Sequence, residues 1–421
     1  MRIALVSDHA SPLAAAGSID SGGQNIYVAH VAKQLARAGH TVDVFTRRDA
    51  PSLPSVVNWL PGVRVIHIAA GPARFIAKED MLPHMADFER SVLRYARRQR
   101  VPYDLVHANF FMSGMVAMGM QRALGTPFVI TFHALGRVRR QYQGDADRFA
   151  DRRFQIEEQL MREATHIIAE CEQDKDDMIR LYQADEGRIS IVPCGFDPEE
   201  MAPVGPAARE VLGYAPADFI VLQLGRIVPR KGIDNVIRGV AILGRERGLN
   251  GRLVIVGGSN AGADLYLLPE IRSLALLAAH EGIADRVHFT GQQPRSVLRH
   301  YYSAADVFVT TPWYEPFGIT PVEAMACGVP VIGSAVGGIK DTVCDAETGY
   351  LVPPAEPRAL AERLALLHAN PELRRRLGAA GMRRAHELFT WSAVVERILD
   401  VYGQVLQRTA DAERLVRVAV Q

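Results

Sequence analysis

The sequence predicts an α/β fold with mostly parallel sheets, divided between two domains. Short apolar runs alternate with amphipathic helical patterns through both halves of the chain, which is typical of βαβ units. The chain has 421 residues, more than one hydrophobic core usually organises, so two domains are expected. The alternation restarts after residues 193–216, a stretch punctuated by proline and glycine that contains no long periodic element. We place the domain boundary there.

The first half is expected to form strands with helices between most of them. The clearest helix spans Gly22–Ala38, because Val28, Val31 and Leu35 share one apolar face and Gly39 ends it. The expected strands are Arg2–Ser7, Thr41–Thr46, Val63–Ile68, Asp104–His107, Phe128–Phe132, His166–Glu170 and Ile189–Pro193.

The second half repeats this architecture without repeating its sequence. The expected strands are Phe219–Leu224, Arg252–Val256, Val287–Phe289, Val307–Thr310 and Pro330–Ile332, and the expected helices begin at Lys231, span Leu265–Glu281 and Pro294–Ala304, and contain Glu323. Helices are then expected to the end of the chain. The last one starts at Thr390 and runs to about Leu406, long enough to pack back on the first domain. We therefore assign residues 1–200 with 390–421 to one domain and 201–389 to the other.

Composition excludes several classes of protein. The formal net charge is +1, from 48 Lys+Arg and 47 Asp+Glu, so no global field favours nucleic acid or an anionic membrane. The four cysteines stand far apart without CxxC spacing, which favours reduced thiols in a cytoplasmic protein over a zinc site or disulfides. No run of eighteen apolar residues occurs, so no integral membrane segment is expected, and the N-terminus is typical of a β-strand rather than a signal peptide. Nothing in the sequence indicates an oligomeric state.

The most informative stretch is residues 313–328, which carries two carboxylates around the start of an apolar helix. Glu315 is expected in the loop above a strand and Glu323 about one turn into the helix. In open α/β sheets, ligands bind beyond the carboxyl ends of the strands, where both residues are expected. The carboxylates of Glu315 and Glu323 are therefore candidates for holding a sugar and a ribose. The alternative for Glu323 is structural, because Thr320 as N-cap, Pro321 at the first helical position and Glu323 fit a capping box.

A basic turn follows the strand Phe219–Leu224. Arg226, Arg230 and Lys231 lie where a helix begins, and cations there oppose the helix dipole by about 0.3–1 kcal/mol each. A bound anion would make cations at this position favourable instead of unfavourable. Arg226 and Lys231 are therefore candidates for holding a diphosphate. The alternative is a solvated basic loop, and Arg230 is the candidate for its solvated member.

The first strand–helix connection and one histidine complete the candidates. Gly22 and Gly23 cost roughly 1 kcal/mol each relative to alanine within a helix, which suits close approach of a phosphate to the backbone. Ser21 and Gln24 have capping-box spacing, so a plain helix start is the alternative. The loop is not GxGxxG, so a dinucleotide oxidoreductase is disfavoured. His133 follows an apolar strand at its carboxyl end, although a lone histidine is more often structural.

In this order and spacing, the chain resembles the retaining family 4 glycosyltransferases, over nearly its whole length. The resemblance is carried by Glu315 to Glu323 as an E-x7-E motif, Arg226 with Lys231, residues 21–24, His133 and Glu347–Pro353. It implies the GT-B fold: two Rossmann-like domains with a cleft between them and a C-terminal helix crossing back to the first.

The resemblance also implies roles for individual residues. Arg226 and Lys231 would hold the donor diphosphate, Glu323 the ribose, and Glu315 with the backbone of Phe317, Gly318 and Ile319 the donor sugar. Gly23, beside Gly22, would lie by the diphosphate and His133 by the sugar hydroxymethyl group.

Two branches of the family are especially similar. Residues 20–28 and Lys78–Pro83 resemble stretches of sucrose synthases and sucrose-phosphate synthases. Gly71-Pro72, Lys78-Glu79 and Tyr103–His107 resemble the D-inositol-3-phosphate glycosyltransferases. The chain departs from the acceptor-phosphate pocket of the latter, with Phe110 where a tyrosine and Ala134 where a threonine is expected.

The family implies hexose transfer from a nucleotide diphosphate sugar to a small hydroxyl acceptor, with retention at the anomeric carbon, without metal or cofactor. UDP-glucose is the first choice of donor, ahead of UDP-GlcNAc and GDP-mannose. An anionic acceptor would suit Lys78 and an arginine-rich segment that includes Arg137 and Arg152; a solvated face is the alternative. The remaining members of that segment are Arg139, Arg140, Arg148 and Arg153. The rival functions are a non-catalytic nucleotide-sugar-binding protein and a phosphorylase dependent on pyridoxal phosphate, for which no cofactor lysine pocket is found.

Overall fold

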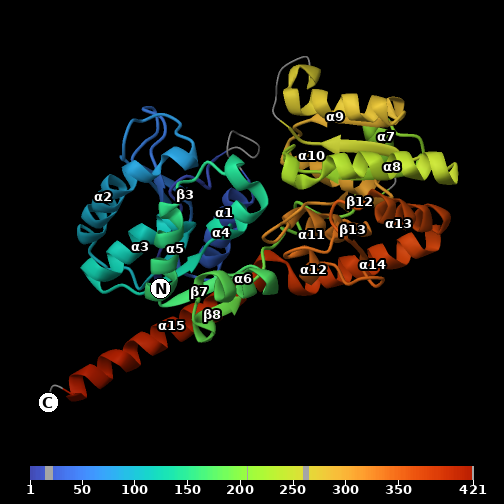
Figure 1. Ribbon diagram of the computed structural model, residues 1–421. Helices are drawn as coiled ribbons and strands as arrows, with labels where there is room; N and C mark the ends of the chain where they lie inside the picture. Colours follow the sequence, from blue (N-terminus) through green and yellow to red (C-terminus); the bar gives the residue numbers. More distant parts are fainter. Residues whose placement is uncertain (15–21, 206, 259–264, 420–421) are drawn as a thin grey trace. The chain divides into compact units, whose positions relative to one another are not determined.

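The computed structural model describes residues 1–14, 22–205, 207–258 and 265–419 (Figure 1). The chain divides into two compact units, one formed by Met1–Pro193 with Trp391–Gln421 and the other by Cys194–Thr390. Each unit is built around its own sheet and hydrophobic core. The predicted α/β fold with two mostly parallel sheets is therefore confirmed.

The sheet of the first unit has eight strands in the order β3-β4-β2-β1-β5-β6-β7-β8. The strands are β1 (Arg2–Val6), β2 (Thr41–Arg47), β3 (Val56–Leu60), β4 (Val63–Ile68), β5 (Leu105–Asn109), β6 (Phe128–Thr131), β7 (His166–Ala169) and β8 (Ile189–Ile191). All neighbours pair in parallel except β3, which is antiparallel to β4. Strands β1, β5, β6 and β7 are almost wholly buried, as continuous apolar runs require when helices cover both faces.

Helices cover both faces of this sheet. They are α1 (Gly23–Arg37), α2 (Met85–Arg97), α3 (Phe111–Leu124), α4 (Gly136–Gln143), α5 (Arg152–Glu163), α6 (Glu172–Tyr182) and α15 (Trp391–Ala419). Helix α3 packs between α2 and α5, whereas α15 packs on α1. At that contact the indole of Trp391, which is 1% exposed, stacks on the ring of His30 at 5.2 Å. The C-terminal helix thereby belongs to the first unit.

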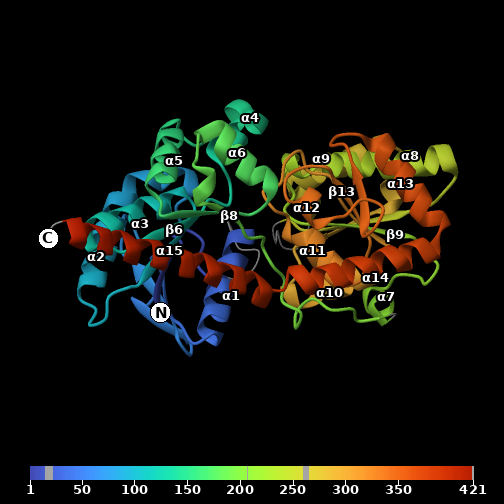
Figure 2. The ribbon, with the colours of Figure 1, turned by 90° about the horizontal axis from the view of Figure 1, so that it is seen from below.

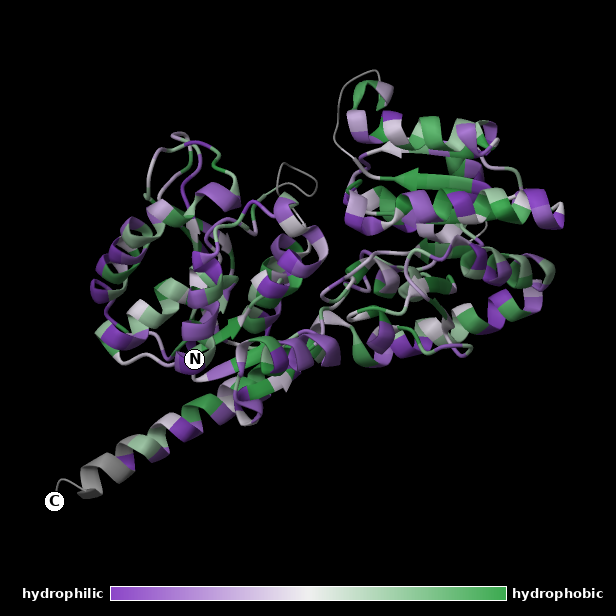
Figure 3. Ribbon diagram, viewed as in Figure 1, coloured by the Kyte–Doolittle hydropathy of each residue, from purple (hydrophilic) through white to green (hydrophobic). Residues whose placement is uncertain are grey.

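The sheet of the second unit has six parallel strands in the order β11-β10-β9-β12-β13-β14. The strands are β9 (Ile220–Leu224), β10 (Arg252–Val256), β11 (Val287–Gly291), β12 (Val307–Thr310), β13 (Val331–Ser334) and β14 (Gly349–Val352). Figure 3 shows hydrophobic strands flanked by helices that carry both hydrophobic and hydrophilic residues. The order places the first strand of the unit, β9, beside β12, where the direction of strand addition reverses.

Helices again form two layers, as Figure 2 shows. Helix α8 packs against α9 and α13 on one face, while α10 with α7 and α11 with α14 pair on the other. The helices are α7 (Ala207–Leu212), α8 (Ile233–Arg247), α9 (Pro269–His280), α10 (Arg295–Ala304), α11 (Ile319–Ala326), α12 (Ile339–Thr342), α13 (Pro357–Ala369) and α14 (Pro371–Leu388). Within the described residues, no helix combines the length and the apolar character needed to cross a bilayer.

Two strands and two helix boundaries differ from the sequence-based expectation. Strand β3 was not predicted because its residues are mostly half-exposed at a sheet edge, and β14 was not predicted because it has only four residues. Helix α11 starts at Ile319 with Gly318 as N-cap rather than at Pro321 with Thr320 as N-cap. Helix α15 continues to Ala419 instead of ending near Leu406.

Candidate functional site

The candidate site of the second unit lies beyond the carboxyl ends of β9 and β12. These strands are neighbours although β10 and β11 lie between them in sequence, so their following loops meet at a topological switch point. The loop after β9 carries Arg226, Arg230 and Lys231, and the loop after β12 carries Glu315. The fold thus brings together the basic turn and the first carboxylate of the E-x7-E motif.

The two loops are joined by an ion-pair cluster. The Lys231 ammonium contacts Oε2 of Glu315, and Nη1 of Arg230 lies 3.3 Å from the same oxygen. The Arg230 guanidinium also donates to the Tyr314 carbonyl at 3.3 Å and lies 5.3 Å from the centre of that ring. The side chains of Arg230, Lys231 and Glu315 are 16%, 13% and 11% exposed. The expectation that Arg230 is a solvated member was wrong, because it binds both residues of the facing loop.

Electrostatics keep Glu315 ionised. Burial alone would raise the pKa of its carboxyl group, but Lys231 and Arg230, with a smaller effect of Arg226, outweigh burial and lower that pKa to about 2. Burial lowers the pKa of the Lys231 ammonium, and the positive charges of Arg230 and Arg226 lower it further. The negative charge of Glu315 has the opposite effect and raises this pKa. Arg226 is exposed, yet it is near enough to act on both groups. The cluster therefore holds three cations around one buried anion.

Glycines allow the loops to approach this closely. Gly232 has φ +63°, and a β-carbon there would lie 2.0 Å from the Thr311 carbonyl oxygen. Gly337, in the loop after β13, has φ +47°, and a β-carbon there would lie 1.8 Å from the Glu315 carbonyl oxygen. Only glycine fits both demands at these two positions. The turn that follows β13 is therefore packed directly on the loop that carries Glu315.

Glu323 is not part of this cluster. Its carboxylate is 2% exposed, lies 2.9 Å from Nη1 of Arg295 and accepts a hydrogen bond from the Tyr302 hydroxyl at 2.9 Å. Arg295 also donates to Glu200 at 2.5 Å, and the two carboxylates raise its pKa against the opposing effect of burial. The capping box expected for Glu323 does not form, since helix α11 has no side-chain cap. In this structure Glu323 is an internal ion-pair partner.

The other residues predicted to bind the donor, Phe317, Gly318 and Ile319, lie at the start of α11. The ring of Phe317 is 3% exposed and lies 6.1 Å from that of Phe389. Gly318 has φ +90° and precedes Ile319, the first residue of α11. The first amide groups of a helix have no partner within the helix, which suits an anionic or hydroxyl ligand.

The candidate site of the first unit lies beyond β1, β5, β6 and β7. Gly22 is the N-cap of α1 and its N–H donates to Oδ1 of Asn25 at 3.0 Å, while Gly23 is the first helical residue. Gln24 instead donates from its side-chain amide to Ser7 Oγ and to the Asn109 carbonyl, both at 3.3 Å. Asn25 therefore does the capping that was expected of Gln24. Ser21, the other residue of the expected capping box, lies outside the described residues.

His133 follows β6 and is 10% exposed. Its Nδ1 lies 2.9 Å from Oε1 of Glu170, and its Nε2 lies 3.0 Å from Oδ1 of Asn109. Its backbone adopts φ +57°, and Phe110 at the end of the neighbouring strand adopts φ +81°. Two non-glycine residues in the left-handed region at one sheet edge indicate a functional constraint, because each costs on the order of 1–3 kcal/mol. No sequence pattern announces such backbone strain.

The residues proposed for an anionic acceptor differ in their surroundings. Lys78 lies in a short 3-10 turn, Lys78–Asp80, and is half-buried. The Arg137 guanidinium contacts Glu158 and the Leu181 carbonyl, so it is already engaged. Arg152 is exposed at the start of α5. The other members of the arginine-rich segment are each paired with a carboxylate: Arg139 with Asp147, Arg140 with Asp151, Arg148 with Asp80 and Arg153 with Glu157. Most of the cationic charge expected in this segment is thus neutralised.

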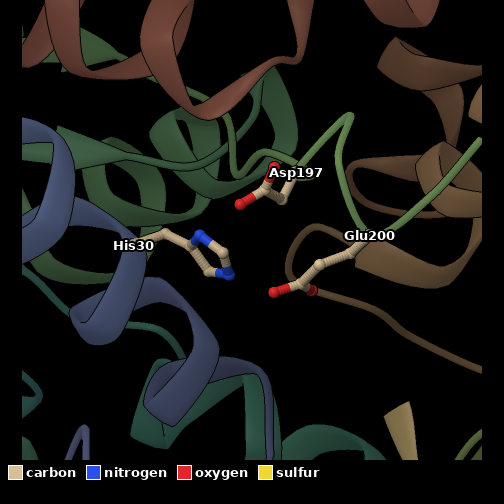
Figure 4. Close-up of side chains that lie close together, drawn as sticks. All are labelled: His30, Asp197 and Glu200. Carbon is tan, nitrogen blue, oxygen red and sulfur yellow. The ribbon is translucent and has the colours of Figure 1, made fainter. Parts of the chain in front are cut away.

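Figure 4 labels one histidine and two carboxylates of metal-ligating types. Asp197 and Glu200 belong to the second unit, where Asp197 Oδ1 accepts from the Glu199 N–H at 3.0 Å and Glu200 pairs with Arg295. His30 belongs to the first unit and stacks on Trp391. Since these contacts lie within separate units, we assign no metal site to the three side chains.

Comparisons with known proteins agree with this geometry. The family model "Glycosyltransferase Family 4" matches residues 21–200, and "Glycosyl transferases group 1" matches residues 206–384. A D-inositol 3-phosphate glycosyltransferase of Kineococcus radiotolerans is 37% identical over 429 residues, covering 98% of this chain and 97% of the relative. Another, from Corynebacterium glutamicum, is 34% identical over 415 residues, covering 96% and 97%.

A solved structure is also similar to this chain over nearly its whole length. Sucrose-phosphate synthase from Thermosynechococcus elongatus is 35% identical and superposes with a TM-score of 0.87, covering 97% of this chain and 99% of that one. The alignment includes residues of both units.

Proposed function

Because the chain belongs to the family 4 glycosyltransferases of GT-B fold, we propose that it transfers a hexosyl group with retention of anomeric configuration and without a metal ion. As a glycosyltransferase it uses a nucleotide-sugar donor. UDP-glucose is the proposed donor, supported by the likeness of residues 20–28 to sucrose-forming enzymes, with UDP-GlcNAc and GDP-mannose as alternatives. The acceptor is proposed to be a sugar or sugar phosphate, in the cytoplasm.

The observation that carries the proposal is the cation cluster in the second unit. Arg226, Arg230 and Lys231 surround one carboxylate at a switch point, which is where α/β sheets bind ligands. A diphosphate needs several cations and free amides, and the start of α8, at Ile233, lies in the same loop. Charge building on the leaving diphosphate would be stabilised there without a metal ion.

We propose the following reaction for this arrangement. The bond between the anomeric carbon and the diphosphate oxygen breaks while the acceptor oxygen bonds to the same face of that carbon. The acceptor proton passes to the leaving phosphate, so no protein base is required. We assign charge stabilisation to Arg226 and Lys231, and contact with the donor sugar to Glu315 and His133.

The phosphorylated acceptor has independent support. The relatives that cover nearly the whole chain at 34–37% identity are named for a phosphorylated compound, D-inositol 3-phosphate or sucrose phosphate. Lys78, half-buried, and Arg152, exposed, are the proposed contacts on the first unit, with Arg137 available only if its bonds to Glu158 and Leu181 are released.

A two-step screen tests the proposal. UDP-, ADP- and GDP-sugars are first assayed for nucleotide release, and the best donor is then combined with sugars and sugar phosphates while the anomeric proton of the product is followed by NMR. We expect release from UDP-glucose, faster with a sugar phosphate and with retained configuration, and unchanged by EDTA. Tight nucleotide binding without turnover under every acceptor would instead identify a binding protein, and an inverted product would refute the mechanism.

A further inference from the structure

The segment around His133 is fixed by buried charges that the reaction itself does not use. The Ala134 carbonyl accepts from the guanidinium of Arg153, and the Gly136 N–H lies 3.1 and 3.0 Å from the two carboxylate oxygens of Glu157. Arg153 and Glu157 are 1% and 0% exposed and pair with each other at 2.7 Å. A buried pair of this kind holds the backbone immediately after His133 in one conformation, so its left-handed φ is imposed by the surroundings.

Both nitrogens of the His133 ring have protein partners. Nδ1 lies 2.9 Å from Glu170 Oε1, and Nε2 lies 3.0 Å from Asn109 Oδ1. The ring also packs against the edge of Tyr27, with 4.8 Å between centroids. The Glu170 side chain is 4% exposed. These contacts leave the imidazole one orientation.

The hydrogen-bond pattern decides where the ring protons lie. The amide nitrogen of Asn109 lies 3.4 Å from the Val6 carbonyl and 3.5 Å from the His107 carbonyl. Since carbonyl groups only accept, the Asn109 amide directs its N–H groups to them and its oxygen to Nε2. An ionised Glu170 likewise only accepts. With Nε2 donating to Asn109, an ionised Glu170 at Nδ1 requires the second ring nitrogen to donate as well, which is the arrangement of an imidazolium balanced by a carboxylate.

A neighbouring carboxyl group does not compete for this role. Burial, followed by the charge of Glu170, raises the pKa of Asp174 to about 8. The Glu170 N–H lies 3.1 Å from Asp174 Oδ2, so the two residues share one small polar region. At neutral pH Asp174 is largely protonated and adds little negative charge. Glu170 is then the main anion facing His133.

The two ring bonds differ in strength. A hydrogen bond from a cation to an ionised carboxylate is stronger than one from the same cation to a neutral amide oxygen, because the full negative charge adds to the attraction. A ligand hydroxyl that approaches the ring therefore replaces Asn109 at Nε2 more readily than Glu170 at Nδ1. We propose that Glu170 is a positioning residue that holds His133 as a doubly protonated donor, and that Asn109 occupies Nε2 until a sugar hydroxyl replaces it. The role of the hydroxyl rests on the proposed function; the ring state and the role of Glu170 do not.

The consequence is chemical. An imidazolium has no lone pair, so His133 serves as a hydrogen-bond donor and a fixed positive charge and cannot take the acceptor proton as a base. This agrees with proton transfer to the leaving phosphate, and it makes Glu170 and Asn109 determinants of a site to which no sequence motif assigns them.

Nitrogen NMR of the full chain labelled with 15N-histidine tests the ring state without any substrate. The chain has 13 histidines, and the spectrum of His133→Gln identifies the signals of His133. At pH 7 we expect both ring nitrogens of His133 to carry protons. In Glu170→Gln one nitrogen should lose its proton, whereas in Glu172→Gln, an exposed position two residues further on, both should keep theirs. A wild-type ring with one bare nitrogen, or an unchanged ring in Glu170→Gln, would overturn the proposal.

A kinetic measurement distinguishes this inference from the proposed function. With the best donor, we expect Glu170→Gln to lower kcat on the order of 10- to 100-fold with the donor KM within about twofold, and Glu170→Asp to recover part of the loss. Unfolding curves that match wild type confirm that the variant is folded. If no donor is turned over but both nitrogens are protonated, the proposed function fails and the inference on Glu170 stands. If a donor is turned over but the His133 ring carries only one proton, the proposed function stands and the inference on Glu170 fails.

Discussion

Replacing Glu315 by glutamine removes the anion that faces the cations of the second unit. Pairing lowers the pKa of this carboxyl group from 4.5 to about 2. At about 1.4 kcal/mol per pH unit, the difference corresponds to about 3 kcal/mol in favour of the folded, ionised state. The side chain is only 11% exposed, so solvent screens the pair little. We expect the variant to lose about 3 kcal/mol of unfolding free energy at pH 7.

The dependence on pH has a definite sign. Because the folded pKa of Glu315 is depressed, its contribution is fully present above its unfolded pKa and is lost as pH falls from about 5 toward 2. About 0.8 kcal/mol of the contribution should be gone at pH 4, so the gap between wild type and the glutamine variant narrows there.

Hydrogen exchange of strands β9 and β12 measures the unfolding free energy of the second unit separately from the first. Glu347→Gln, at an exposed position of the same unit, is the control and should change that free energy by less than about 0.5 kcal/mol. A difference in unfolding free energy below about 1 kcal/mol at pH 7 between wild type and Glu315→Gln, or one that widens toward pH 4, would show that the ion pairs of Glu315 do not stabilise the second unit.

Three further substitutions test the same unit. In Gly337→Ala the new β-carbon would lie 1.8 Å from a backbone carbonyl oxygen, so calorimetry should show a lower Tm, whereas Gly403→Ala, with no atom within 4 Å, should not lower it. Arg295→Met leaves Glu323 buried without its cation and should cost about 3–5 kcal/mol in urea unfolding; a loss under 1 kcal/mol would contradict the pairing. Arg230→Ala should weaken nucleotide-sugar binding about tenfold, or about 1.4 kcal/mol, by titration calorimetry, and unchanged affinity would exclude Arg230 from the donor site.

The sequence was sufficient for the elements that follow a strong local rule. Long buried strands such as β1 and β9 appear as continuous apolar runs, and α1 is announced by its apolar face and the glycine that ends it. The meeting of Lys231 and Glu315 could also be predicted, because carboxyl ends of parallel strands meet at one edge. Local periodicity and sheet topology together determine both results.

Other features depend on contacts that no local rule contains. From the sequence, Arg230 is interpreted as a solvated cation. In the fold it contacts Tyr314 and Glu315 of the facing loop. Glu323 fits a capping box by spacing, but its carboxylate forms an ion pair with Arg295, almost thirty positions earlier. Glu170 stands at the end of an unremarkable strand and becomes visible only through its distance to His133. Such pairings arise from tertiary packing, so the sequence alone could not reveal them.

The central claim is that the second unit holds the donor diphosphate through Arg226 and Lys231. The most direct test compares kcat/KM for nucleotide release from UDP-glucose, with the best acceptor, in wild type, Lys231→Met and Lys175→Met. Lys175 pairs with Glu186 at 2.7 Å in the first unit and is the matched control. We predict a loss on the order of 100- to 1000-fold in Lys231→Met only, the effect of removing one stabiliser of transition-state charge. Wild-type turnover in Lys231→Met would show that Lys231 does not hold the donor diphosphate.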